Sequence, residues 1–304
     1  MTSQFKGIYA ATIVPLKKNR KIDKKSFNKN IKNVSNTKGI KGLLINGHAG
    51  ENFTLGDDEQ IKLVKLAKKD KKKDTKIISG LNFEDSLFAS RVGKNMIKAG
   101  ADALLIFPPF SWSQGVTSEM IYKHHKIICN KLNHPIFIYQ SSIYSGHLCY
   151  KKNTLKKLLK LKNIIGVKEG SWNYKNYVSN YKFFKKHNKK FLVMASGDEH
   201  IYPCFKYASD GSQVSIASIV PEKVVELIKS IENKQYYKAK KIDKKLLILA
   251  KNIYGKYPSN FATARIKYCL KVLRKIPRET MRSSIELDTK EKIQLKKSLK
   301  LSML

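Results

Sequence analysis

The sequence lacks the features of a disulfide-bonded, metal-binding or membrane protein. Its four cysteines, Cys129, Cys149, Cys204 and Cys269, are far apart and form no Cys-x-x-Cys pair, so neither a zinc site nor a disulfide framework is expected. No run of ~18 uncharged apolar residues occurs, which argues against a membrane partner. The start, MTSQFKGIYAATIVPLKKNR, lacks the pattern of a secretion signal, so we expect a cytoplasmic location.

Arginine is also scarce, although the formal net charge is +38. Only six of the 61 basic residues are arginine. Bidentate recognition of phosphate and guanine uses the guanidinium group, so no specific nucleic-acid partner is expected. The lysines are spread along nearly every predicted helix at amphipathic spacing, and we interpret them as solvent-exposed faces. Weak, nonspecific polyanion binding remains an expectation from charge alone.

Short apolar runs alternate with amphipathic segments along most of the chain. The 304 residues, 42% of them hydrophobic, can supply one large α/β domain. The apolar runs are typical of parallel strands that helices cover on both faces. We predict eight, at residues 7–15, 42–47, 76–81, 101–109, 135–140, 163–170, 191–197 and 212–218. Eight such units favour a (β/α)8 TIM barrel over an open doubly wound sheet, since no Gly-x-Gly-x-x-Gly follows the first strand.

The remainder of the chain has only helical signals. We therefore predict a barrel over residues 1–224 and a C-terminal helical region over residues 225–304. No linker rich in glycine, serine or proline separates the two parts, so we expect the helical region to pack against the barrel.

The carboxyl ends of barrel strands carry the reactive groups, because the loops that follow them converge on one mouth. Lys168 closes the otherwise apolar strand NIIGVKEG. Burial there would disfavour the ammonium form and supply the neutral amine that attacks a ketone. Tyr139, one strand earlier, would share the mouth and shuttle protons. The alternatives are a Lys168–Glu169 ion pair and a tyrosine that only packs.

Five motifs follow one another along the chain: GIYAATIVPL, NGHAGENFTL, IYQSSIYSG, IIGVKEGSWN and SGDEHIYPCFKYASDGSQVS. In this order they resemble the pyruvate-dependent class I aldolase family that includes dihydrodipicolinate synthase and N-acetylneuraminate lyase. The resemblance implies that Lys168 forms the Schiff base, that Tyr139 is the acid/base residue, and that Gly47, His48 and Ala49 bind the substrate carboxylate. It also implies no cofactor or metal, a small-molecule 2-oxo acid substrate, and a homo-oligomer, dimer or tetramer.

Several positions depart from that family pattern. His48 and Ala49 stand where two hydroxyl residues are usual, and Phe110 replaces the tyrosine that a neighbouring subunit contributes to the synthase's proton relay. Tyr144, a candidate substrate-binding residue, replaces the synthase's arginine for the carboxylate of aspartate semialdehyde. Losing a desolvated charge contact of that kind weakens binding by ~2–5 kcal/mol. Authentic 4-hydroxy-tetrahydrodipicolinate synthase is therefore the alternative and not the leading prediction.

Other positions resemble the neuraminate lyase branch. Asp198 and Glu199 match an acidic pair, and Ser215, placed on the eighth strand, matches a serine, which that branch uses on sugar hydroxyls. Each also has a structural alternative as a solvent-exposed carboxylate or a core serine. Gln213, a polar residue on the same strand, is expected either to line the cavity or to face the helices.

Three further aromatic or imidazole side chains lie near these motifs in the sequence. Trp112 is expected either to wall the site or to contact another subunit, and His124 and His125 are predicted to be surface residues of a helix.

The leading prediction is a Schiff-base-forming class I lyase, an aldolase or a dehydratase, acting on pyruvate or a 2-keto-3-deoxy sugar acid. The rival from another class is a non-catalytic 2-oxo acid sensor or polyanion-binding protein.

Overall fold

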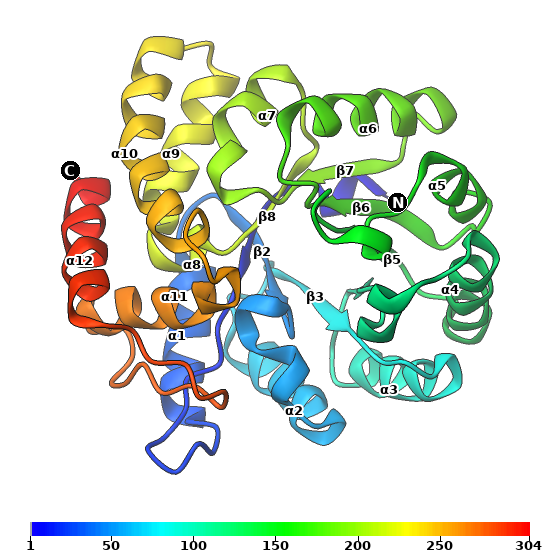
Figure 1. Cartoon of the computed structure of the whole chain (residues 1–304), viewed down its shortest axis with the longest axis horizontal. Helices are drawn as coiled ribbons and strands as arrows, with labels where there is room; N and C mark the ends of the chain where they lie inside the picture. The colour runs from blue at the N-terminus through cyan, green and yellow to red at the C-terminus, as the bar shows by residue number, and fades with distance from the viewer. Residues whose placement is uncertain (1) are drawn as a thin grey trace.

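Eight parallel strands close into a barrel in the computed structural model, which describes residues 2–304 (Figure 1). Each strand pairs with the next one in sequence, and the first pairs with the last. The strands are β1 (Gly7–Ala11), β2 (Ile40–Ile45), β3 (Lys76–Leu81), β4 (Ala103–Ile106), β5 (Ile136–Gln140), β6 (Ile164–Glu169), β7 (Leu192–Ala195) and β8 (Gly211–Val214). The predicted TIM barrel is confirmed, and the open sheet is excluded.

Helices surround the strands, as Figure 1 shows. They are α1 (Lys24–Asn36), α2 (Asp57–Asp70), α3 (Ser86–Lys98), α4 (Ser118–Leu132), α5 (Lys152–Leu158), α6 (Tyr174–His187), α7 (Ile201–Tyr207), the short α8 (Ile216–Ile219) and α9 (Pro221–Glu232). Side chains fix several helix starts: Asp23, Asp85, Thr117 and Asn173 each accept a hydrogen bond from a backbone N–H of the first turn. No helix of residues 2–304 is both long and apolar enough to cross a bilayer.

Four predicted strands are shorter in the structure by at least three residues: those at residues 7–15, 101–109, 191–197 and 212–218. In each case a run of buried residues continues past the last residue of the strand into the loop at the mouth. Ser215 therefore lies after β8, immediately before α8, and not on the strand as predicted. Buried loop residues that do not pair in the sheet give the same signal in the sequence as residues of a buried strand.

The C-terminal helical region consists of α10 (Tyr236–Tyr254), α11 (Ala262–Val272) and α12 (Thr289–Met303). It lies at one side of the barrel, with α10 packed against α9 and α12 (Figure 1). The predicted boundary after residue 224 falls inside α9. That helix belongs with the barrel, because Val225 packs on Gly39 and Glu222 accepts a hydrogen bond from Thr37 (3.3 Å). We propose that the helical region begins with α10.

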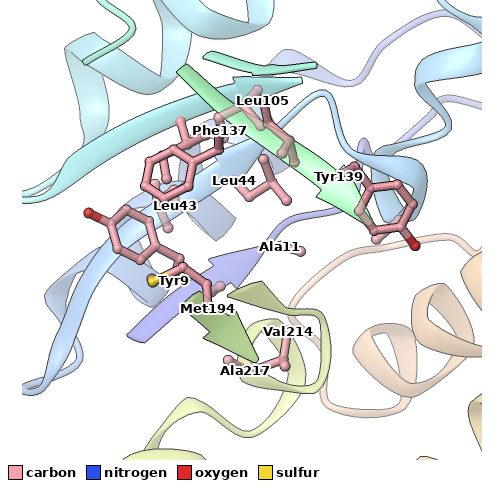
Figure 2. Close-up of a cluster of buried hydrophobic side chains, with 14 of the residues drawn as sticks. Tyr9, Ala11, Leu43, Leu44, Leu105, Phe137, Tyr139, Met194, Val214 and Ala217 are labelled. Carbon is pink, nitrogen blue, oxygen red and sulfur yellow. The ribbon is translucent and has the colours of Figure 1, made fainter. Parts of the chain in front are cut away.

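Large and small side chains alternate in the barrel interior. The strand register puts Tyr9 beside Gly42, and Phe137 beside Gly166. A Cβ atom on Gly42 would overlap the Tyr9 ring and lie 2.8 Å from the backbone oxygen of Lys76. Figure 2 shows Tyr9 and Phe137 within this core, with Tyr139 at the end of its strand. The barrel interior is thus filled by side chains.

The variant Gly42→Ala should lose about 1–3 kcal/mol of unfolding free energy, because the added methyl group meets a ring and a backbone oxygen that cannot both move. Urea unfolding of the purified protein measures this loss. Gly56→Ser is the control, since a Cβ there meets nothing within 4 Å and serine is a good N-cap residue. Equal stability of the two variants would contradict the packing argument.

Candidate active site

The strand register brings Tyr139 and Lys168 together. The two residues are direct partners in the β5–β6 pairing, and both are buried on the inner face of the barrel. The Nζ atom of Lys168 lies 5.3 Å from the centre of the Tyr139 ring and 5.8 Å from that of Phe107. A single amine therefore faces two aromatic rings at the carboxyl end of the strands.

The ionisation of Lys168 is set mainly by burial. Burial lowers the pKa of Lys168 to about 8, and the nearby Asp198 carboxylate opposes this only partly. Glu169, the next residue, points to the opposite side of the strand, where its carboxylate accepts hydrogen bonds from Asn180 (2.7 Å) and Ser171 (3.1 Å). The alternative Lys168–Glu169 ion pair does not form. Near neutral pH a useful fraction of Lys168 is the unprotonated amine.

Tyr139 is buried and tightly packed. Burial, followed by the Glu169 charge, raises the pKa of Tyr139 to about 12, while contact with the Trp172 side chain acts in the opposite direction. Gly170 makes room for the ring, because a Cβ atom there would lie 2.8 Å from the Tyr139 Cε2 atom. The phenol therefore stays protonated over the physiological range and can donate or relay a proton.

His48 faces the same group from the loop after β2. This loop forms the 3-10 turn η2 (His48–Gly50), which follows Gly47. The half-buried imidazole stacks on Phe107 at 4.3 Å and meets Tyr139 edge-on at 5.6 Å. Burial, assisted by the Lys168 charge, lowers the pKa of His48 to about 3. The ring therefore faces inward, towards Phe107 and Tyr139, and is neutral near pH 7.

A buried ion pair anchors this loop to the C-terminal helical region. Glu51, which has a left-handed backbone (φ 54°), contacts the ammonium of the fully buried Lys267 on α11. The backbone N–H of Arg282 donates a second bond to Glu51 (3.1 Å), and Thr263 donates to the backbone oxygen of His48 (3.3 Å). The position of the Gly47–Ala49 loop thus depends on residues more than 200 positions away.

Asp198 and Ser215 form a second polar group at the mouth. Asp198, in the turn η6 (Asp198–His200), is buried, and its Oδ1 atom accepts from the Ile216 N–H (2.6 Å) and the Ser215 hydroxyl (3.2 Å). Burial raises the pKa of Asp198 to about 6, although the Ile216 N–H and the Lys168 charge oppose the shift. Both contacts use Oδ1, and Oδ2 accepts no hydrogen bond from residues 2–304.

Two aromatic residues of the mouth were missed by the sequence reasoning. Tyr254, at the end of α10, shares a hydrogen bond with Ser215, and its ring packs 4.8 Å from that of Trp172. Trp172 has a left-handed backbone (φ 54°), which is strained for a bulky residue and turns the chain just after β6. No sequence signal identifies Tyr254, because its place depends on how α10 packs on the barrel.

The other candidate residues lie in different surroundings. Tyr144 is 84% exposed and does not join the buried group around Lys168. Glu199 is half-buried and faces the end of α10 at Gly255. Gln213 is the partner of Tyr9 in the β1–β8 pairing, so it faces the barrel interior, where its buried amide has no hydrogen-bond partner within residues 2–304. Among residues 2–304, no three His, Cys, Asp or Glu side chains converge as metal ligands.

The prediction that His124 and His125 are surface residues is wrong. Both are buried on α4, because the turn η4 (Phe110–Gln114) covers them. Trp112 of that turn packs edge-on against His124 at 5.2 Å, and His124 bonds to the Ser86 hydroxyl (2.9 Å). Trp112 therefore packs on α4 and does not wall the group around Lys168.

Comparison with known proteins gives consistent results. The model of the dihydrodipicolinate synthetase family matches residues 4–302. A 4-hydroxy-tetrahydrodipicolinate synthase from Bartonella bacilliformis is 30% identical over 88% of this chain and 90% of its own length. The structures of a dihydrodipicolinate synthase from Agrobacterium tumefaciens (TM-score 0.88, 19% identity, 99% of both chains) and an N-acetylneuraminate lyase from Fusobacterium nucleatum (TM-score 0.85, 22% identity, 98% of both chains) share the fold.

A barrel whose mouth holds a buried amine beside a buried phenol defines, with these matches, a class I lyase. The chain belongs to the dihydrodipicolinate synthetase family. The predictions of an enzyme and of a synthase-like lyase are confirmed, and the non-catalytic alternative is not favoured.

The variant Lys168→Met should be more stable than the natural protein at pH 7, by up to about 3 kcal/mol, because a pKa lowered from 10.5 to about 8 reports the cost of burying the ammonium. Between pH 8 and 10.5 the unfolded chain binds a proton that the native lysine does not. The stability of the natural protein therefore rises relative to the variant over that range. Urea unfolding of both proteins as a function of pH measures the difference.

The control for this experiment is Lys160→Met, which replaces an exposed lysine of the same β5–β6 connection. The stability of this variant should show no comparable gain at pH 7, and its difference in stability from the natural protein should not change with pH. A Lys168→Met variant that behaves in the same way would show that Lys168 is not desolvated.

Proposed function

We propose that Lys168 forms a Schiff base with a 2-oxo acid such as pyruvate. The observation that carries the proposal is the buried amine of lowered pKa, which faces the mouth, has no salt-bridge partner within residues 2–304 and lies beside Tyr139. The neutral amine attacks the ketone carbon, and a carbon–nitrogen bond forms. The ketone oxygen then takes up protons and leaves as water. Tyr139 is the group placed to move these protons.

The Gly47–Ala49 loop supports recognition of the carboxylate of this acid. His48 is neutral, so its ring can donate a hydrogen bond but adds no charge. Ala49 is buried and has no hydroxyl, which leaves backbone N–H groups as the remaining donors. The protonated Schiff base then withdraws electrons from the neighbouring carbon, where a bond to a proton or to a second carbon is made or broken.

The polar residues around Asp198 support an inference about the second fragment, which is joined to or released from the 2-oxo acid. A carboxylate with one free oxygen, the Ser215 hydroxyl and the Tyr254 hydroxyl together suit a polyhydroxylated fragment. We therefore favour an aldolase or dehydratase for a 2-keto-3-deoxy sugar acid. In the alternative, authentic 4-hydroxy-tetrahydrodipicolinate synthase, the exposed Tyr144 would have to replace a guanidinium group.

We also propose that the protein is a cytoplasmic homo-oligomer, a dimer or a tetramer. Phe53 and Phe110 are about half exposed, and their rings lie 6.2 Å apart beside His48. An exposed aromatic pair at the mouth is the kind of surface that a second copy covers. Because Phe110 has no hydroxyl, such a copy would shield the site and not relay protons.

Reductive trapping tests the Schiff base. Incubation with pyruvate and borohydride, followed by digestion and mass spectrometry, should give one adduct, on Lys168. The trapping rate should rise with pH to about 8 and then level off, because the pKa of Lys168 is about 8 and not 10.5. Lys168→Ala should give no adduct, and Tyr139→Phe should trap about 10²–10⁴-fold more slowly. Adducts scattered over exposed lysines, or none with a panel of 2-oxo acids, would overturn the proposal.

Ser215→Ala tests the sugar-acid assignment separately. It should raise the KM for a 2-keto-3-deoxy sugar acid by about tenfold, the value of one hydrogen bond to a charged or buried partner. Pyruvate trapping at Lys168 should not change, since Ser215 contacts Asp198 and Tyr254 and not the amine. Ser218→Ala, which removes a buried hydroxyl bonded to the Ser215 backbone oxygen, is the matched control. An unchanged KM in Ser215→Ala would remove this group from substrate recognition.

A further inference from the structure

A cavity of about 740 Å³ lies outside the barrel, between the β1–α1 loop and the C-terminal helical region. Its walls come from the hairpin closed by the Leu16–Ile22 bridge, from α11, from residues 278–287 and from the start of α12. None of the residues placed around Lys168 lines it. Its volume is typical of a small-molecule site.

The lining of this cavity is mainly cationic. Its charged residues are Lys18, Arg20, Lys271, Arg278 and Lys292, against Glu279 and Glu286. Glu279 is already bound by Lys271 (2.5 Å) and Lys292 (3.2 Å), so these three charges largely satisfy one another. Lys18, Arg20 and Arg278 form no salt bridge within residues 2–304. Positive charge therefore remains uncompensated around a concave surface.

Arginine, scarce elsewhere, is concentrated here. Two of the chain's six arginines, Arg20 and Arg278, line the cavity, and a third, Arg282, supports its wall. The Arg20 and Arg282 side chains each donate to the other's backbone oxygen (3.3 Å), which ties the hairpin to the C-terminal segment. Arg282 is fixed in turn by two bonds of 2.6 Å to Glu59. The two walls are thus held in place before any ligand arrives.

Neutral donors complete the cavity. Thr280, Ser283 and Ser284 line it, and the Ser283 hydroxyl is buried without a hydrogen-bond partner in the described chain. Guanidinium groups with nearby hydroxyls suit phosphate or carboxylate oxygens. Three uncompensated cations spread over 740 Å³ exceed what one carboxylate needs, so pyruvate is not the ligand that this cavity fits.

We propose that this cavity binds a small polyanion that carries at least two phosphate or carboxylate groups. The site is independent of the Schiff-base chemistry, because it shares no residue with the barrel mouth. It also differs from weak attraction to the +38 charge, because it requires particular side chains on two separate segments.

Titration calorimetry of the full-length protein at ~0.15 M salt, where surface attraction is largely screened, tests the proposal. Inorganic pyrophosphate and citrate are the two probes. We expect saturable binding of at least one probe at one site per chain. Tighter binding of pyrophosphate would assign a phosphate ligand, and tighter binding of citrate a polycarboxylate. Failure of both probes to bind would overturn the proposal.

A pair of double variants separates this site from nonspecific attraction. Lys18→Gln with Arg278→Gln should weaken binding of the better probe at least tenfold. Lys17→Gln with Arg274→Gln removes the same charge from nearby exposed positions that do not line the cavity, and should change affinity less than twofold. All four side chains are exposed, so both proteins should fold and still trap pyruvate at Lys168 if the proposed function holds. Equal weakening in the two double variants would overturn the cavity assignment.

Discussion

The desolvation of one ammonium group is the constraint on which the barrel mouth depends. Lys168 is surrounded by aromatic rings and has one carboxylate, Asp198, in its electrostatic environment. A closer carboxylate would stabilise the charged form at the expense of the neutral amine, whereas the absence of any carboxylate would make burial of the ammonium more costly. The structure lies between these two cases, since a carboxylate is near Lys168 but opposes the lowering of its pKa only partly. Glu169 is directed to the outside of the barrel, and Asp198 is held back by the Ile216 N–H and Ser215.

The C-terminal helical region is part of the site as well as a cover for the barrel. Tyr254 extends from α10 to the hydroxyl of Ser215, and Lys267 extends from α11 to Glu51. A barrel alone would position Lys168 and Tyr139, because strand pairing decides that. It would not position the loop that faces them. The Lys168–Tyr139 pair and the loop that faces it thus have different structural origins.

The barrel and the meeting of Lys168 and Tyr139 at its mouth could be predicted because each depends on local signals, namely apolar runs and strand ends. Asp198 and Ser215 could be singled out one by one from short motifs, but the hydrogen bond between them could not be predicted. The burial of His124 and His125 could not, since the helix they share is lysine-rich and the covering turn around Trp112 has no helical or strand pattern. Tyr254 and the Glu51–Lys267 pair depend on contacts between distant segments, which spacing along the chain does not reveal. The orientation of Gln213 depends on the strand register, because a shift of one residue would turn its side chain from the barrel interior towards the helices.

The Glu51–Lys267 pair has a consequence for the order in which the protein matures. All eight strands are complete by residue 214, yet the partners of Glu51 come from residues 267 and 282. During synthesis a closed barrel can form while these residues are still inside the ribosome, and its Glu51 carboxylate must then stay in water. The loop that faces Lys168 takes its final place only when the last fifth of the chain emerges. A prematurely terminated product would keep Lys168 and Tyr139 paired but would lack the contacts that fix the loop facing them.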